Sequence, residues 1–467
     1  MSADRTTQAK PAAYDVIVVG AGPAGATTAY YLATGAERGP GRRVALLEKA
    51  RFPRDKYCGD AWCAPALDIL EEMGVLQKLE GEGLVRDTTS GGFISPSGES
   101  YVSTGEGGTA PGTRCYAIKR IICDERIARR AAEVGADLVE DAAVCATELE
   151  GDGLWTVRCR DGRRFRCKML VAADGANSRV ARSLGVVTTP PDGVASRQYV
   201  VGGSHNFKSG GVLFYPRYIL PGYVALFRHY DDDIDLGAYA IPGGAVTPGG
   251  LRELYRERIK IDPFVRRALG PRVEFREPVR IAPLRLGGVE RSTARQFMAV
   301  GDAAGQTDPL TGEGIHTGMI GGKLAAQTLC ELFARGEFSE SACRLYHQRW
   351  MAAFGRDFAA SAVGARMVYR YPLFMDAANR VAQRKGDAFM SQFGAVMTGV
   401  KPKTTFLRPD LALPLGMEVL RQIAGRGPFS AHASEEEAYA ARAVANTPRA
   451  TAFRNGCLID PQLDLER

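Results

Sequence analysis

The sequence predicts an α/β protein in which a Rossmann-type nucleotide-binding domain carries an inserted antiparallel β-sheet domain and a helical C-terminal region. Three glycine-rich stretches indicate this fold, at residues 20–25, 173–178 and 300–305, with about 120–150 residues between successive stretches. Apolar runs typical of buried parallel strands precede the first and the third stretch. Because ligands bind at the carboxyl ends of parallel strands, we expect one extended dinucleotide to contact all three stretches.

The N-terminal segment predicts a strand, a glycine turn and a helix. Residues 14–19 are apolar and β-branched, and residues 23–33 are rich in alanine. Glycines at this spacing allow a tight turn, close approach of the backbone to a pyrophosphate, and close packing of the helix on the strand. The N-terminus of the helix favours the negative charge, although a glycine turn without a ligand is the alternative interpretation. The motif assigns Gly20, Gly22, Pro23, Ala24 and Gly25 to cofactor binding.

The next predicted strand, residues 43–48, ends on an acid. Glu48 suits the hydroxyls of an adenosine ribose, and no arginine follows immediately to bind a 2′-phosphate. Residues 35–42 resemble an inserted loop that lengthens the usual spacing. We assign Glu48 and the adjacent Lys49 to the cofactor, and Arg120, at the start of a later predicted helix, could reach the phosphates or the ribityl chain.

The third motif identifies the dinucleotide. Residues 296–300 form an apolar run, and Gly301 and Asp302 follow at its carboxyl end. A carboxylate there accepts hydrogen bonds from ribityl hydroxyls, which NAD does not have, whereas Asp302 taken alone could be a helix N-cap. The combined motifs predict FAD in a domain of the glutathione-reductase and hydroxylase type, and the middle stretch adds Asp174 and Gly175 to its contacts.

The segment after the third motif is expected to contact the flavin ring. Glycines let backbone N–H groups approach the pyrimidine edge of the ring, and a helix that begins near His316 would stabilise negative charge developing there on reduction. The candidate contacts in this segment are Pro309, Gly312, Gly314 and Ile315.

Composition limits the class of protein. A chain of 467 residues with 45% hydrophobic content supports two joined domains with a large core. The absence of an 18-residue apolar window and of a secretory signal, together with ten scattered cysteines without a CxxC pair, predicts a cytoplasmic protein without a metal centre. No nucleic-acid module is present. The net charge of +7 suits an ordinary solvated surface, or contact with anionic lipids or diphosphates.

The domains are predicted to be discontinuous. Short apolar runs between the nucleotide-binding segments alternate with Gly/Pro turns, which is typical of an antiparallel sheet over the flavin. In the helical region, Trp350, Phe354, Phe358, Met367 and Tyr371 are expected to pack inside. The FAD-binding domain is assigned residues 14–60, 112–180 and 290–335, the substrate-binding sheet domain 61–111 and 186–288, the helical region 340–425, and a polar tail 428–467.

Two segments resemble a known flavoprotein family. Residues 52–60 have the sequence Phe-Pro-Arg-Asp-Lys-Tyr-Cys-Gly-Asp, and residues 309–315 have the sequence Pro-Leu-Thr-Gly-Glu-Gly-Ile. Both resemble the geranylgeranyl reductase family, which includes archaeal digeranylgeranylglycerophospholipid reductases and bacterial menaquinone reductases. The resemblance covers roughly residues 14–335. It implies that Cys58 lies beside the flavin and that Gly59 and Asp60 belong to the cofactor site.

One stretch departs from the family pattern. The family usually has Tyr-x-Trp-x-Phe-Pro over the flavin, where aromatic residues guide a prenyl chain. Here Tyr223 and Phe227 match, Ala225 replaces tryptophan and Arg228 replaces proline. A smaller wall with a cation beside it would suit a different or more polar substrate.

The resemblance implies saturation of carbon–carbon double bonds in a hydrophobic prenyl or lipid substrate, with peripheral membrane contact. NADPH or reduced ferredoxin would recharge the FAD, and a positioned acid would complete the addition while water is excluded. Cys58, whose thiol is protonated at neutral pH (ordinary pKa about 8.5), and His316 are the candidate acids; their alternatives are a packing cysteine and a helix-start histidine. A flavin monooxygenase of a small molecule and an electron-transfer flavoprotein without substrate chemistry remain the other classes.

Overall fold

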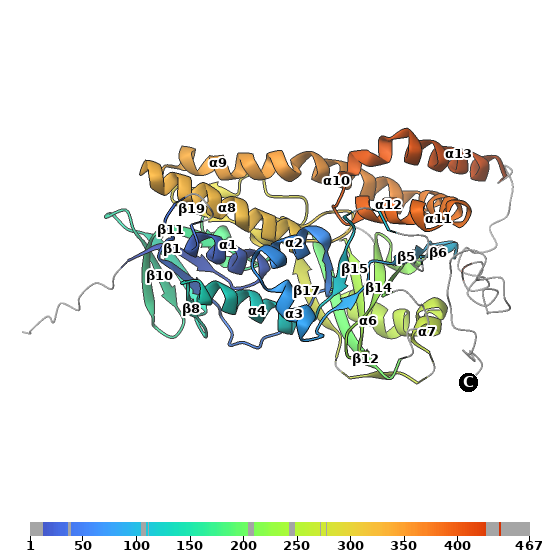
Figure 1. Cartoon of the computed structure of the whole chain (residues 1–467), viewed down its shortest axis with the longest axis horizontal. Helices are drawn as coiled ribbons and strands as arrows, with labels where there is room; N and C mark the ends of the chain where they lie inside the picture. The colour runs from blue at the N-terminus through green and yellow to red at the C-terminus, as the bar shows by residue number, and fades with distance from the viewer. Residues whose placement is uncertain are drawn as a thin grey trace, which may run out of the picture.

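The computed structural model describes residues 13–35, 39–103, 109–110, 112–203, 210–241, 248–270, 272–276, 278–425 and 439. Two large sheets lie at opposite ends of an elongated molecule, and long helices run along one side of both (Figure 1). The predicted fold class is confirmed. The polar tail predicted at 428–467 falls outside the described residues, except for Tyr439.

The first sheet carries the glycine motifs at one edge. Its strands run in the order β18-β19-β11-β1-β2-β8, and the pairs from β19 to β8 are parallel. Val19 pairs with both Leu47 and Ala172, so the ends of three strands meet where the turns at Gly20, Glu48 and Ala173 begin. The strands are β1 (Tyr14–Val19), β2 (Val44–Leu47), β8 (Asp137–Val139), β11 (Arg164–Ala172), β18 (Thr293–Ala294) and β19 (Phe297–Ala299), with the hairpin β9 (Val144–Leu149) and β10 (Trp155–Cys159) attached to β11.

Helices, among them α1 (Pro23–Ala33), cover one face of this sheet (Figure 1). The helix α1 has the predicted bounds and packs between α4 (Arg120–Glu133) and α8 (Ile315–Arg335). A Cβ at Gly322 of α8 would lie 2.5 Å from the carbonyl oxygen of Ala24. Glycine is therefore required for these helices to pack this closely.

The second sheet is mainly antiparallel and stands between two groups of helices. Its strands run in the order β16-β12-β15-β14-β13-β5-β6, with β17 paired to β12, and among the described residues only β13 and β5 pair in parallel. Helices α6 (Pro248–Glu257) and α7 (Pro263–Leu269) lie on one side (Figure 1). The strands are β5 (Gly91–Ile94), β6 (Ser100–Val102), β12 (Gly193–Val201), β13 (Gly211–Phe214), β14 (Gly222–Arg228), β15 (Ile234–Ala240), β16 (Glu274–Phe275) and β17 (Arg280–Leu284).

The segment predicted as strands over 61–111 begins differently. After β3 (Ala61–Cys63), the chain forms the helices α2 (Ala64–Glu72) and α3 (Leu76–Gly81), and β3 pairs with β7 (Cys115–Ala117), which also pairs with β4 (Arg86–Asp87). Pro65 lies in the first turn of α2, where its fixed φ and missing N–H are tolerated, and the apolar residues that follow pack on α8. The prediction of strands alone was therefore wrong for 64–81.

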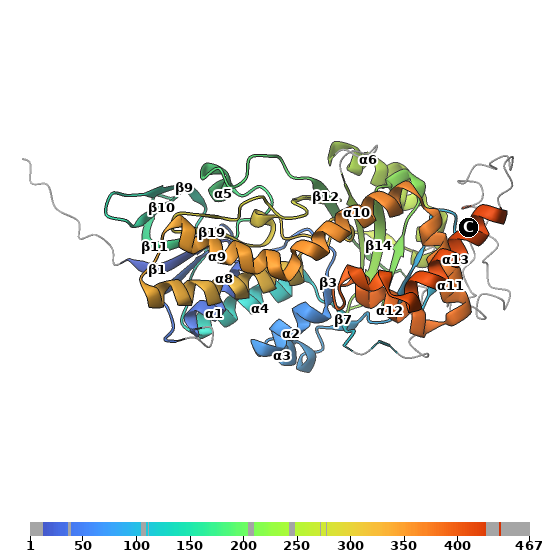
Figure 2. The same ribbon diagram turned by 90° about the horizontal axis from the view of Figure 1, so that it is seen from above.

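The C-terminal helices extend from the first sheet to the second. Seen from above, α9 (Glu340–Trp350) crosses the first sheet, and α10 (Arg356–Arg370), α11 (Leu373–Lys385), α12 (Asp387–Met397) and α13 (Pro409–Gly425) lie toward the second (Figure 2). Trp350 and Phe358 are buried as expected, but Met367 and Tyr371 are 45% and 53% exposed, so their predicted packing was wrong. No helix among the described residues is long and apolar enough to cross a bilayer.

Candidate active site

The glycines of the first turn have two different roles. Gly20 and Gly25 are required by the fold itself, whereas Gly22 is required only if a cofactor binds there. Gly20 has a φ of +103°, and a Cβ at Gly25 would lie 1.9 Å from the carbonyl oxygen of Gly20. At Gly22, however, a Cβ would meet only the Nη2 atom of Arg54, at 3.9 Å. The open space beside Gly22, at the N-terminus of α1, fits a pyrophosphate held by backbone N–H groups.

A buried ionic network supports this turn. Glu48 is buried and its Oε2 accepts a hydrogen bond from the backbone N–H of Ala21 at 3.0 Å. Arg54 donates to the carbonyl oxygen of Ala21 at 3.1 Å and to Asp124 at 2.5 Å, and Arg120 binds the same carboxylate through two hydrogen bonds. Sequence reasoning missed Arg54, although it lies in the segment 52–60 that carries the family resemblance. Lys49 is exposed, and the contacts of Arg120 and Lys49 with FAD stay predictions.

The second and third motifs lie at the same edge of the sheet. Gly175 and Gly301 both have positive φ, at +84° and +61°. The Asp174 carboxylate accepts hydrogen bonds from Ser178 and from the backbone N–H of Arg179, so it organises its own turn. Asp302 accepts a hydrogen bond from the Thr307 hydroxyl at 3.0 Å, which fixes one of its carboxylate oxygens, and its contact with a ribityl chain stays a prediction.

The segment predicted to contact the flavin ring packs closely against Tyr239 and Thr307. Gly312 has a φ of +70°, and a Cβ there would lie 2.8 Å from the ring of Tyr239, which donates a hydrogen bond to the carbonyl oxygen of Pro309. A Cβ at Gly314 would lie 2.6 Å from the Thr307 hydroxyl oxygen. The helix α8 begins immediately afterwards at Ile315, so its N-terminus faces the place where the ring would lie. The residues present therefore fit FAD.

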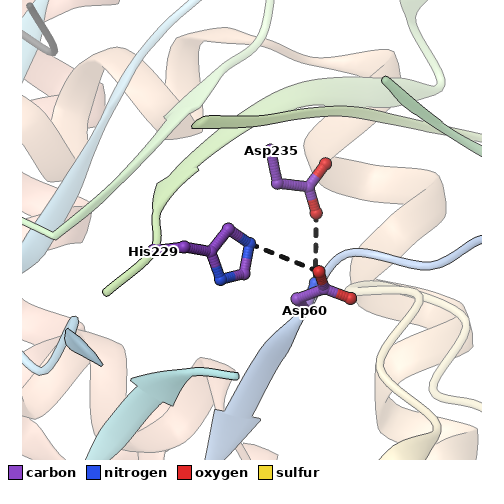
Figure 3. A group of neighbouring side chains, drawn as sticks. All are labelled: Asp60, His229 and Asp235. Carbon is purple, nitrogen blue, oxygen red and sulfur yellow. Dashed lines mark hydrogen bonds and ion pairs between the residues drawn. The ribbon is translucent and has the colours of Figure 1, made fainter. Parts of the chain in front are cut away.

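Asp60 points toward the second sheet, as Figure 3 shows. Its Oδ2 accepts a hydrogen bond from Tyr199 at 2.6 Å and lies 3.3 Å from His229 Nε2, while Arg197 lies 3.6 Å from Oδ1. Burial alone would raise the pKa of Asp60, but His229 and Arg197 lower it; burial raises the pKa of the neighbouring Asp235. Asp60, His229 and Asp235 lie close enough to share a cation. Arg197 already supplies positive charge there, so we propose no metal, and the contact of Asp60 with FAD stays a prediction.

A cavity of about 660 Å³ joins the flavin edge to the second sheet and the C-terminal helices. Cys58, Gly59, Gly312, Gly314, Ile315 and His316 line one part of it, and Tyr223, Ala225 and Phe227 of β14 line another. The volume lies within the range of about 300–1,000 Å³ that is typical of ligand pockets. Most of the cavity wall is apolar or aromatic.

Arg228 does not line this cavity. Alternate residues of a strand face opposite sides, so Arg228 points away from Ala225. Its guanidinium binds Asp232 at 2.6 Å. The expected cation beside Ala225 was therefore wrong, and the wall at Ala225 is smaller without being more polar.

Glu313, which sequence reasoning did not single out, is the acid of this cavity. Its side chain lines the cavity, and Cys63 Sγ donates to Oε1 at 3.5 Å. Among the described residues its buried Oε2 has no hydrogen-bond partner, and His316 Nδ1 lies 3.8 Å away. Burial raises the pKa of Glu313 to about 7, against the opposing effect of Lys403. The sequence contains one indication of this role: Glu313 lies between Gly312 and Gly314, within the segment predicted to contact the flavin.

The two predicted acids, Cys58 and His316, lie on the same cavity, and both are uncharged at neutral pH. Burial, with Lys403 nearby, lowers the pKa of His316 to about 4, so its ring is neutral at neutral pH. Burial raises the pKa of the Cys58 thiol, which keeps it protonated but weakens it as an acid. Of the three side chains, Glu313 combines a proton at neutral pH with the greatest acidity.

Comparison with known proteins identifies the family. Residues 13–206 match the family model described as an FAD binding domain. A Dictyostelium discoideum protein named conditioned medium factor receptor 1 is 43% identical over 418 residues, covering 87% of this chain and 81% of that protein. Digeranylgeranylglycerophospholipid reductase 1 of Methanopyrus kandleri is 31% identical over 371 residues, covering 76% of this chain and 90% of that protein. The chain belongs to the geranylgeranyl reductase family.

The fold agrees with this assignment. The crystal structure of a geranylgeranyl bacteriochlorophyll reductase-like protein from Thermoplasma acidophilum is similar with a TM-score of 0.68 and 20% identity, covering 82% of this chain and 96% of that chain. As a member of the geranylgeranyl reductase family, the protein is an FAD-dependent oxidoreductase. The predictions of FAD and of the family are confirmed.

We expect the purified protein to be yellow and to release its FAD on denaturation. The predicted phosphate contacts are backbone N–H groups, which bind without a covalent bond.

Asp302→Ala should weaken FAD binding by roughly 10–100-fold, because a charge-assisted hydrogen bond contributes about 1.5–3 kcal/mol. FAD titration of the apoprotein measures this, with Asp161→Ala, an exposed acid that binds Arg163, as the matched control. Equal affinities in the two variants would contradict the role of Asp302.

Proposed function

We propose that this protein reduces carbon–carbon double bonds in a prenyl chain of the geranylgeranyl type, or in a related hydrophobic substrate. The observation that carries the proposal is the apolar cavity, which begins at the segment predicted to hold the flavin ring and continues over β14. Ala225, in place of the tryptophan usual in the family, leaves room for a chain between Tyr223 and Phe227. The related Methanopyrus kandleri protein is named for a lipid that carries such chains.

FAD, once reduced by NADPH or by reduced ferredoxin, supplies a hydride equivalent at this end of the cavity. The residues of the chain supply the rest. Gly22 and the N-terminus of α1 would hold the pyrophosphate, Glu48 would hold the adenosine ribose and Asp302 would hold the ribityl chain. The apolar wall excludes water, and the buried carboxyl of Glu313 holds a proton that an unactivated alkene needs. We propose Glu313 as the acid, with Cys58 as the other candidate.

A role in binding alone is the second candidate, because the 43% identical relative is named as a receptor. The position of a buried, protonatable carboxyl on the cavity, with one oxygen that lacks a hydrogen-bond partner among the described residues, favours chemistry over binding. Substrate-dependent reoxidation of the flavin separates the two roles, because a receptor binds its ligand without oxidising the flavin.

The test begins with the reduced protein under anaerobic conditions. We expect geranylgeranyl diphosphate or lipid-linked geranylgeranyl chains to reoxidise the flavin, followed by stopped-flow absorbance, and mass spectrometry to show a gain of two hydrogen atoms for each bond reduced. Separate reduction with NADPH and with reduced ferredoxin identifies the donor. Reoxidation by oxygen but not by these substrates would indicate a monooxygenase, and reoxidation only by a protein or quinone partner would indicate an electron-transfer flavoprotein. Either result would overturn the proposal.

A further inference from the structure

The helix α13 presents an apolar face to solvent. Leu413, Met417, Leu420 and Ile423 follow one another at helical spacing and are between 53% and 66% exposed. The opposite face is fixed to the molecule, because Glu418 is buried and its carboxylate binds arginines of α11. These ion pairs hold α13 in its orientation, so the helix cannot rotate to bury its apolar face.

Neighbouring elements extend this face. Val363 and Met367 of α10 are 56% and 45% exposed, and Leu407, at the end of the short helix η5 (Lys403–Leu407), is 79% exposed. We call these three residues and the four of α13 the apolar C-terminal face. The helices α10 and α13, which carry most of it, lie on the side of the second sheet away from α6 and α7 (Figure 1).

The cavity of the active site reaches this face. Met367 and Leu407 line the cavity and are also exposed, as is Gly416 of α13. The cavity therefore has a mouth between α10, η5 and α13, and the same cavity is lined at its inner end by Cys58 and His316. A hydrocarbon chain could pass from this mouth to the flavin segment without crossing water.

The charge around the mouth is positive. Residues 351–425 contain ten Lys and Arg against five Asp and Glu, and three of those five acids are buried. Arg366 and Arg370 are exposed on α10 beside Met367, and Arg408 and Arg421 are exposed beside η5 and on α13. Exposed apolar side chains flanked by cations are typical of a helix that lies in the interface of an anionic bilayer.

We propose that the apolar C-terminal face lies on the surface of an anionic lipid bilayer, so that the cavity opens into the bilayer and takes its substrate from there. The idea that the substrate enters by this route rests on the proposed function, whereas bilayer binding does not. A second copy of the chain is the less suitable occupant. In a two-fold dimer the same surface meets its own copy, so the exposed arginines of both copies would enter one interface, where Asp357 and Asp410 are the only acids of residues 351–425 that are not buried.

The experiment uses the full chain with vesicles of phosphatidylcholine, with and without phosphatidylglycerol, and measures the bound fraction by flotation. We expect binding to the anionic vesicles that weakens as salt is raised. The double variant Leu413→Ser/Leu420→Ser should lower the partition coefficient about tenfold or more, because it removes apolar carbons from the bilayer. Ile261→Ser, an equally exposed apolar residue (68%) on the other side of the second sheet, is the matched control and should bind normally.

Bound FAD and the melting temperature show that each variant is folded. Normal vesicle binding by the double variant, or no binding by the native protein at low salt, would overturn the proposal. The proposal would also be overturned if size-exclusion chromatography showed that the native protein is a dimer and that the main effect of the double variant is to dissociate it. The measurement needs no substrate or electron donor, so a failure of bilayer binding is distinct from a failure of the proposed reduction.

Discussion

The Gly22→Val variant is expected to fold and to bind no FAD that survives desalting. A side chain at position 22 meets only the end of the Arg54 side chain, at 3.9 Å, and Gly22 has an ordinary φ of −75°. The protein alone therefore tolerates valine. The pyrophosphate does not, because the branched side chain occupies the space where backbone N–H groups must reach the phosphate oxygens. The loss should exceed the roughly 10–100-fold expected for Asp302→Ala.

Gly25→Val is the contrasting variant. Its Cβ would lie 1.9 Å from the carbonyl oxygen of Gly20 and 2.9 Å from Cβ of Ala173, so the turn itself must move. We expect a loss of more than about 3 kcal/mol in the free energy of unfolding, or no soluble protein. Thermal melting and FAD absorbance distinguish the two variants. If Gly22→Val retained its yellow colour, the pyrophosphate would have to lie elsewhere.

The elements that a sequence predicts well are those in which local chemistry and the fold require the same residues. The strand at 14–19, the turn at Gly20 to Gly25 and the helix at 23–33 follow from strand propensity, glycine geometry and alanine content within a single stretch. The segment 64–81 does not have this property. Its apolar residues suit strand and helix alike, and packing on α8 decides in favour of helix.

In the candidate site, too, some features follow from local sequence and others only from the fold. Backbone roles, such as those of Gly22 and Gly312, are visible as glycine spacing, whereas charge states depend on burial that only the fold creates. Glu313 became the cavity acid because burial among segments remote in sequence raises its pKa, although Lys403 and the hydrogen bond from Cys63 oppose that rise. Met367 fits the apolar pattern of α10 yet is exposed, because nothing among the described residues packs over that side of the helix.

Glu313→Gln is expected to slow substrate-dependent reoxidation of the flavin by about 10²–10⁴-fold, as is typical of a lost general acid. The amide has nearly the same shape and holds no proton that it can donate. FAD content and reduction by the electron donor should stay within a few-fold of the native values. Cys58→Ser is the comparison. If Glu313 supplies the proton, serine at position 58 costs a few-fold at most, and the opposite ranking of the two variants would transfer the role to Cys58.

The pH dependence tests the same assignment independently. The pKa of Glu313 is raised to about 7, so its carboxyl is protonated below that pH and loses its proton as the pH rises through it. The rate constant of reoxidation by substrate should therefore be constant below about pH 7 and fall about tenfold for each further pH unit. In Glu313→Gln this break should disappear. A native profile that stays flat to pH 9 would show that the donor is a weaker acid, as the Cys58 thiol with its raised pKa would be.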